Sequence, residues 1–234
     1  MKRTLATLLI AALDLPASLR SVGRNAFYGR LGLKEADISG LETMGSGAFS
    51  FSGLVNIAVP GSLKEIPESA FECCADVETV TISEGVEIIR AYAFSTLGYG
   101  KGSTDTYNFL TDAEAEQYRD VVHADDPALK RFYSVSLPST VRVVEDCAFL
   151  GTWLDGLYLD WLTDVSQLPD IESFLPHPDS YECIYVSPET YEAQGDALNR
   201  YFSQDETFEY WMGKVRVFEG RHHYWTDEEL GIDA

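Results

Sequence analysis

An alanine–phenylalanine pair recurs at a nearly constant spacing along the chain. The pairs are Ala26-Phe27, Ala48-Phe49, Ala70-Phe71, Ala93-Phe94 and Ala148-Phe149. Successive alanines lie 22, 22, 23 and 55 positions apart. A period of roughly 20 to 50 residues is typical of proteins that stack one small structural unit on the next. This periodicity constrains the fold of the 234-residue chain more than any other feature.

Two further apolar positions precede every pair at the same distances. An apolar residue stands four places and seven places before each alanine. These residues are Leu19 and Val22, Leu41 and Met44, Leu63 and Ile66, Val86 and Ile89, and Val141 and Val144. Because several unlike positions recur in the same order, we interpret the spacing as a structural repeat.

A strand-like block of the form apolar-x-x-apolar-x-apolar lies further upstream in each repeat. Residues two apart share one face of a strand, so the last two apolar positions point inward and their neighbours point to solvent. Three blocks end directly in Pro16, Pro60 or Pro138, and proline closes a strand because it cannot donate to a ladder. The blocks are Ile10-Leu13-Leu15, Leu33-Ala36-Ile38, Leu54-Ile57-Val59, Val77-Val80-Ile82 and Phe132-Val135-Leu137.

Such short strands cannot bury their apolar rows alone. Stacking successive coils about 4.8 Å apart gives each strand a parallel neighbour and each inward row a partner above and below. The pattern therefore predicts a solenoid with short parallel strands on one face. On the opposite side we expect irregular or short helical turns, where the alanine allows close backbone approach and the phenylalanine fills the interior.

The repeat unit resembles the leucine-rich repeats of the BspA type, which read approximately L-x-x-I-x-L-P-x-S-V-x-x-I-G-x-x-A-F-x-x-C. The segment LVNIAVPGSLKEIPESAFECC, residues 54–74, matches this unit nearly throughout, including Cys74. The resemblance covers residues 10 to about 159 apart from one insertion. The chain departs from it where the second repeat is one residue short between Ile38 and Leu41, and where most repeats lack the cysteine.

The resemblance implies a right-handed leucine-rich-repeat solenoid of the α/β repeat class. Two more strand blocks extend it, Leu154-Leu157-Leu159 and Tyr181-Ile184-Val186. The segment YECIYVSPETYEAQ resembles a terminal unit in which a strand is followed by a helical or mixed closing segment. We therefore expect a solenoid over residues 1–160, and a last repeat, closing segment and acidic tail over 161–234.

One loop between repeats is much longer than the others. Phe132 follows Phe94 by 38 positions where other repeats need five or six, so about 32 residues are inserted. We place the insertion at about 97–128 and expect an irregular loop followed by one short helix. It could contact a partner, since loops on a rigid scaffold often carry recognition, or it could be a tolerated surface insertion. Its candidate contact residues are Tyr99, Tyr107, Phe109 and Tyr118.

The outward positions of the strands supply a second candidate binding surface. Most of them carry small or polar side chains, which would let a partner approach a flat face closely; alternatively, small residues merely suit tight curvature. The candidate binding residues are Asp14, Asp37, Asn56, Thr79, Thr81, Ser134 and Ser136, beside the further outward positions Ala12, Glu35 and Ala58.

The charge of the chain excludes several partners. The formal net charge of −21 would repel nucleic acid and anionic membrane surfaces at long range. The charge is uneven, because residues 154–234 carry 18 Asp and Glu against 4 Lys and Arg, whereas residues 1–94 carry 11 against 8. The acidic C-terminal end is thus expected to be a distinct surface.

No catalytic or cofactor motif is present in the sequence. It contains no G-x-S-x-G, phosphate-binding glycine loop, zinc signature or dinucleotide fingerprint. His222 and His223 are adjacent in the sequence, and adjacent histidines on one segment rarely bind the same metal ion. We predict no catalytic residue, no metal site and no cofactor. The four cysteines are interpreted as buried thiols: Cys73, Cys74, Cys147 and Cys183.

The N-terminal segment MKRTLATLLIAAL resembles a secretory signal. The repeat register argues against cleavage, because Ile10 and Leu13 occupy strand positions. The apolar run is also shorter than the roughly 20 residues that span a bilayer. Since nothing before the first strand provides the polar cap that a solenoid needs, we expect either a fragment of a longer chain or end-to-end pairing through this coil.

Taken as a whole, the sequence predicts a non-catalytic protein-interaction module. The resemblance implies a surface or secreted protein of a host-associated microbe, which adheres to or recognises a host protein or a second copy of itself. One alternative is an intracellular scaffold of the same fold, so a cytoplasmic location stays open. Another is a hydrolase that uses acidic residues of the C-terminal region.

Overall fold

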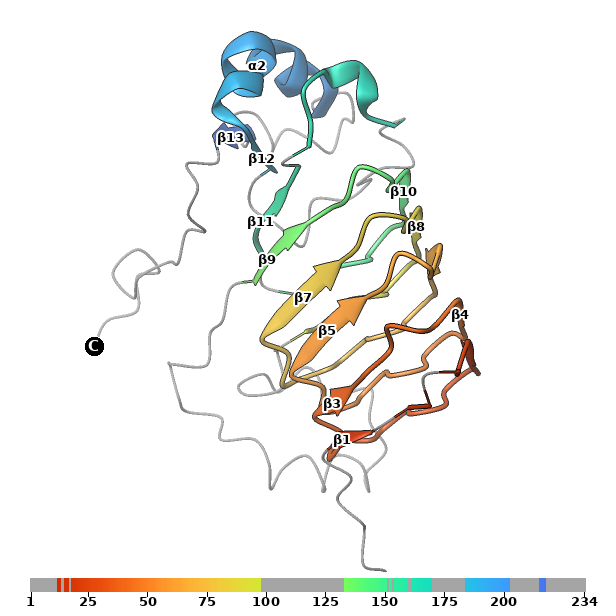
Figure 1. Cartoon of the computed structure of the whole chain (residues 1–234). Coiled ribbons are helices and arrows are strands. Elements are labelled where there is room, and N and C mark those ends of the chain that lie inside the picture. The colour runs from red at the N-terminus through yellow and green to blue at the C-terminus, as the bar shows by residue number, and fades with distance from the viewer. Residues whose placement is uncertain are drawn as a thin grey trace, which may run out of the picture.

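The computed structural model describes residues 12–13, 15–16, 18–97, 133–150, 152, 154–159, 161–169, 184–202 and 215–217. Through these residues the chain forms a stacked β-solenoid of about five turns, with one described helix near the C-terminal end (Figure 1). We number coils 1 to 5 by the phenylalanine that each contributes: Phe27, Phe49, Phe71, Phe94 and Phe149. The predicted fold class, a leucine-rich-repeat solenoid, is confirmed.

Each coil contributes a short strand to one side of the solenoid, and the paired strands are parallel. β1 pairs with β3, β5 pairs with β7, and β9, β11, β12 and β13 form one sheet. In β5 and β7 alternate residues are buried and exposed, as the spacing of the apolar residues predicts. The strands are β1 (Ala12–Leu13), β3 (Glu35–Ala36), β5 (Asn56–Val59), β7 (Thr79–Ile82), β9 (Tyr133–Ser136), β11 (Leu154–Tyr158), β12 (Ile184–Val186) and β13 (Val215–Val217).

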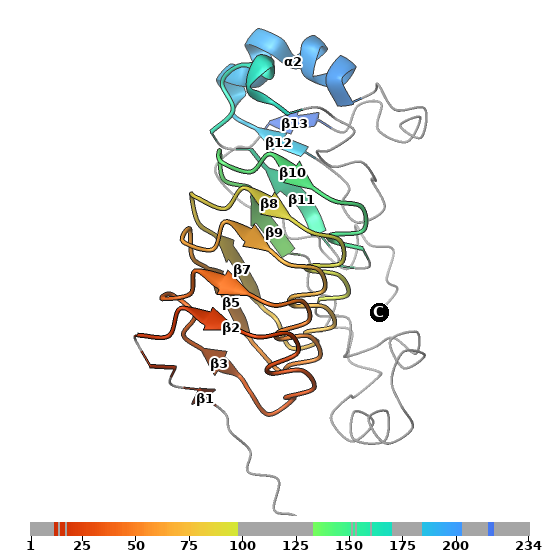
Figure 2. The ribbon, with the colours of Figure 1, turned by 90° about the vertical axis from the view of Figure 1, so that its right-hand side faces the viewer.

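A second row of strands lies on another side of the coils (Figure 2). These strands are only two residues long, and the second residue of each is the apolar position four places before the alanine. We had expected turns away from the first row, so this row was not predicted. The strands are β2 (Ser21–Val22), β4 (Thr43–Met44), β6 (Glu65–Ile66), β8 (Ile88–Ile89) and β10 (Val143–Val144), paired as β2-β4 and β6-β8-β10.

The Ala-Phe segments form turns that are hydrogen-bonded from coil to coil. The Phe49 N–H donates to the Ala70 carbonyl at 2.9 Å, and the equivalent bond recurs between each pair of successive coils. The residue before each alanine has a positive φ, which bends the chain into the turn: Asn25, Gly47, Ser69, Tyr92 and Cys147. A left-handed residue at the same place in every coil explains why the turns stack in register.

The core is a column of phenylalanine rings flanked by the two apolar rows. Successive ring centroids from Phe27 to Phe149 lie 5.0, 5.6, 5.5 and 5.4 Å apart. From Phe49 onward each ring is tilted by 10° or less from the next one along the column. Phe49, Phe71 and Phe94 are completely buried. The inward strand residues, including Ile57 and Val59, belong to the same apolar cluster.

The C-terminal part closes the stack with a helix. β12 is followed by α2 (Pro188–Phe202), as the sequence predicted, and the Ser187 hydroxyl accepts a hydrogen bond from the Thr190 N–H at the start of this helix. A short 3-10 helix, η4 (Val165–Gln167), packs against α2, and so does β13. β13 was not predicted because its segment does not follow the repeat pattern.

Coils 4 and 5 stack directly although the chain between them is long. β8 pairs with β10, and Phe94 stacks on Phe149. Leu97, which we expected to open the insertion, is instead 1% exposed and part of the core, and its N–H donates to Thr152 Oγ1 at 3.0 Å. Leu97 therefore belongs to the core of coil 4 rather than to the insertion. The rest of the expected insertion lies outside the described residues.

Candidate interaction surfaces

The outward positions of β5, β7 and β9 form an exposed surface of small side chains, which we call the strand face: Asn56, Ala58, Thr79, Thr81 and Ser136. Asn56 pairs with Thr79 in the sheet register, and the Thr79 hydroxyl donates to Asn56 Oδ1 at 2.6 Å. Successive side chains of a strand point to opposite faces. Because Ile57 and Val80 point into the core, the side chains next to them point to solvent.

The strand face becomes acidic towards coil 2. Glu35 and Asp37 are exposed there. Hydrogen bonds from the hydroxyl and the backbone N–H of Ser39 lower the pKa of Asp37, so this carboxylate is ionised at neutral pH. The face thus offers a neutral centre with negative charge at one border.

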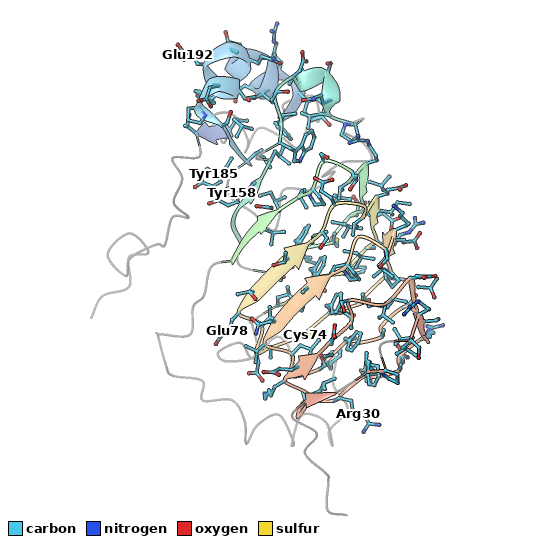
Figure 3. All side chains as sticks on the ribbon, viewed as in Figure 1. Arg30, Cys74, Glu78, Tyr158, Tyr185 and Glu192 are labelled. Atoms are coloured by element: carbon cyan, nitrogen blue, oxygen red, sulfur yellow. The ribbon has the colours of Figure 1, made fainter. Side chains whose placement is uncertain are left out.

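At the other border the outward positions carry two buried tyrosines. Tyr158 is paired in register with Ser136 on one side and with Tyr185 on the other. The two tyrosine rings stack with centroids 4.5 Å apart, and the residues are 0% and 7% exposed (Figure 3). The open part of the strand face therefore ends before β11. The sequence carried a signal for this border, since an aromatic residue replaces the usual small one at an outward position.

The side that carries the two-residue strands is occupied by ion pairs between coils. Arg90 bridges Glu65 at 2.9 Å and Glu145 at 2.5 Å, which raises the pKa of Arg90. The pairs Arg20–Glu42 and Lys64–Glu87 add similar contacts at 3.4 and 3.5 Å. Because these charged side chains are already paired with one another, this side is a weaker candidate for binding a partner than the strand face.

In several coils the residue three places after the phenylalanine is buried and makes a hydrogen bond. Cys74 donates to the Phe49 carbonyl at 3.2 Å and contacts the Ser52 hydroxyl at 3.3 Å. In coil 5 Thr152 takes this place and donates to the Phe94 carbonyl. The cysteine of the repeat unit is thus a hydrogen-bonding core residue that a threonine can replace.

None of the described cysteines forms a disulfide, and two of them have thiols of low reactivity. Burial raises the pKa of Cys73 and of Cys74 to about 12, so both thiols stay protonated at neutral pH and neither is an activated nucleophile. The prediction of buried thiols is confirmed for these two residues. Cys147 is only half-buried, because it sits in the outer turn before Ala148, and the side chain of Cys183 lies outside the described residues.

These features identify the repeat. Residues 6–99 match the family model of the BspA type leucine rich repeat region, in six copies. This segment consists of BspA-type leucine-rich repeats. Coil 5 lies beyond the matched segment but has the same turn, the same ring stacking and the same strand pairing, so the solenoid continues through it. No curated protein matches the chain.

The match to BspA-type repeats indicates a general class of function. BspA-type repeats typically serve as non-catalytic modules for protein interaction, which suggests that this chain is a repeat protein for protein interaction. Within the described residues, no group of three or more His, Cys, Asp or Glu side chains is placed to hold a metal ion. None of the helices in the described part is long and apolar enough to cross a membrane.

The structure brings part of the predicted site together on one side of the solenoid. Asn56, Thr79, Thr81 and Ser136 lie on the strand face, with Asp37 exposed near its acidic border. Ser134 lies in β9, but its side chain is not among those described. The remaining predicted residues lie outside the described part of the chain: Asp14, Tyr99, Tyr107, Phe109 and Tyr118.

Proposed function

We propose that this protein is a non-catalytic recognition module whose protein partner binds the strand face. The observation that carries the proposal is the row of small, exposed side chains along β5, β7 and β9. Small side chains let the backbone of a partner come close to the sheet over several coils. Tyr99, Tyr107, Phe109 and Tyr118 form the second part of the proposed site, since tyrosine gives rigid contact area at low entropic cost.

The remaining sides of the solenoid support this choice. One side is held by ion pairs such as Arg90 with Glu65 and Glu145. The turn side uses its backbone groups in hydrogen bonds between coils. Among the described residues, the centre of the strand face, Asn56, Ala58, Thr79 and Thr81, has one side-chain contact, the exposed hydrogen bond between Thr79 and Asn56.

We place the protein at the cell surface or outside the cell of a host-associated microbe, where it adheres to or recognises a host protein or a copy of itself. BspA-type repeats are often surface-associated, which supports this setting. An intracellular scaffold of the same fold is the alternative. Expression of the full gene with an epitope tag separates the two, because only a surface or secreted protein is detected on intact cells or in the medium.

The site is tested with the double substitution Thr79→Arg and Thr81→Arg. Both residues are exposed, so the folded state should tolerate arginine, while two bulky cations on the face should block a docked partner. We expect a pull-down from host and self proteins to lose the partner that the unmodified chain captures. Glu68→Arg is the matched control, because it changes the net charge equally at an exposed position on the turn side. Unchanged capture by the double variant would exclude the strand face.

A further inference from the structure

The two ends of the solenoid differ in charge and in apolar exposure. At the coil 1 end, Leu15, Leu19 and Phe27 are only partly buried, whereas the equivalent phenylalanines of coils 2 to 4 are completely buried. Ala26 is exposed, although every later alanine of this series is buried. Coil 1 therefore presents an apolar edge that the stack itself does not cover.

Positive charge surrounds this apolar edge. Residues 15–34 include four Arg and Lys residues and no Asp or Glu. Arg24 and Arg30 are exposed, and neither makes an ion pair among the described residues. Tyr28 is 38% exposed next to them in sequence. Coil 1 thus combines apolar and cationic groups, which is a composition that favours an acidic, aromatic partner.

The opposite end of the solenoid has the complementary composition. Helix α2 turns Thr190, Leu198 and Phe202 inward. Its outer side exposes three acidic residues and a tyrosine that is 36% exposed: Glu189, Glu192, Asp196 and Tyr191. Within the described part of the chain none of these three carboxylates makes an ion pair. Figure 3 shows Arg30 and Glu192 at opposite ends of the molecule.

We propose that coil 1 of one copy docks on the outer side of α2 of a second copy, in a head-to-tail contact. Phe27 and Leu19 would cover apolar surface beside Tyr191, and Arg24 and Arg30 would meet the carboxylates of α2. Pairing of two coil 1 ends is disfavoured, because it would bring Arg24 and Arg30 of both copies together. The docked surfaces differ, so the contact is heterologous and leaves a free basic end and a free acidic end that extend the assembly or close it into a ring.

The contact would add a property that the proposed recognition function does not require. Docking at the ends leaves the strand face of every copy open, because that face runs along the side of the coils (Figure 1). A row of copies would then present the same face repeatedly to a surface that carries many partner molecules. Binding to such a surface gains strength from multivalency without any change in the single site.

The test measures molar mass by light scattering and sedimentation over a range of protein concentrations. In about 0.1 M salt we expect the mass to rise with concentration, and in about 1 M salt we expect it to fall towards the monomer, because charges at exposed contacts are then screened within about 3 Å. A chain that stays monomeric at high concentration in the lower salt overturns the proposal.

Two end variants identify the surfaces. The coil 1 variant carries Arg24→Glu and Arg30→Glu, and the α2 variant carries Tyr191→Ala, Glu192→Gln and Asp196→Asn. Each alone should be monomeric, and an equimolar mixture should form a dimer that grows no further, since each variant retains one intact end. The control variant, Lys64→Glu with Arg142→Glu, has the same net charge as the coil 1 variant but is altered in coils 3 and 5, outside coil 1 and α2, and it should associate like the unmodified chain.

The other outcomes contradict the head-to-tail contact. Dimers of the α2 variant alone would mean that two coil 1 ends pair with each other. Full association of both variants would place the interface elsewhere, and so would loss of association in the control variant. Thermal unfolding followed by circular dichroism confirms that every variant remains folded. Because the measurement concerns only self-association, its result is independent of partner capture by the strand face.

Discussion

Phe71 lies in the middle of the phenylalanine column, with Phe49 on one side and Phe94 on the other. Its ring is stacked on both faces, and the residue is completely buried. The adjacent coils are also hydrogen-bonded through the Phe71 N–H and the Ala93 carbonyl at 2.9 Å. Neighbours fixed in this way have little freedom to collapse into a vacated site.

We therefore expect Phe71→Ala to reduce the free energy of unfolding by about 3–5 kcal/mol, as is usual when a buried aromatic site is emptied. Denaturant titration measures the change. Phe27→Ala is the matched control: Phe27 occupies the same repeat position but is only partly buried and stacks on one side, so its loss should be smaller. A loss under about 1 kcal/mol for Phe71 would contradict the enclosed ring column.

The inward residues could be predicted from the sequence because each must match its counterparts above and below. Ile57, Val59 and Phe71 therefore recur at fixed spacing, and all are buried. The left-handed turn residues could not be predicted in this way, because Asn25 and Tyr92 share a positive φ but no side-chain property. Backbone conformation is set here by the hydrogen bonds of the neighbouring coil.

At the scale of elements, the turns that follow successive strands press closely on one another. Gly61 follows β5, and a Cβ atom added there would lie 1.8 Å from the Glu84 carbonyl oxygen of the next coil. Gly85 has φ +110°, and a Cβ atom there would lie 2.5 Å from the Gly61 carbonyl oxygen. The two turns can approach this closely because glycine occupies both positions.

Gly61→Ala should therefore destabilise the protein by about 1–3 kcal/mol, because the added methyl group forces two backbones apart. Thermal or denaturant unfolding measures the loss. Gly23→Ala serves as control, since no described atom lies within 4 Å of a Cβ added there, and it should change stability by no more than about 0.5 kcal/mol. Equal stability of the two variants would show that the turns separate readily.

The elements differ in how well they can be predicted from the sequence. β5 and β7 were predicted because four residues suffice to show the alternation of buried and exposed side chains. β6 and β8 have two residues each, so only one inward side chain marks them and no alternation is visible. β13 lies outside the repeat and is recruited by pairing with β12, a contact that its own sequence does not reveal.

At the scale of the whole molecule, stability is expected to be a sum of contacts between neighbouring coils. Coils 4 and 5 make these contacts directly, through β8 with β10 and through Phe94 with Phe149. Arg90 of coil 4 also bridges to Glu145 of coil 5. The solenoid therefore has a continuous core from coil 1 to coil 5.

Replacing residues 98–128 by a short Gly-Ser link should preserve a single cooperative unfolding transition, because Leu97 and all the contacts between coils 4 and 5 are retained. Calorimetry or denaturant titration measures the transition. Partner capture should be lost if the tyrosines of this segment belong to the binding site, as proposed above. A deletion variant that unfolds in two steps or fails to fold would show that the segment is part of the core.

Because coils 4 and 5 stack directly, the connection between them is a site where sequence can be inserted or replaced. The last residue described before the long connection, Leu97, and the first after it, Tyr133, belong to coils that already hold each other in register. Evolution can lengthen, shorten or rewrite the sequence between them while the repeats keep their own constraints. A laboratory can do the same, and an epitope or a foreign binding loop grafted at this junction should be carried by a scaffold that need not be redesigned.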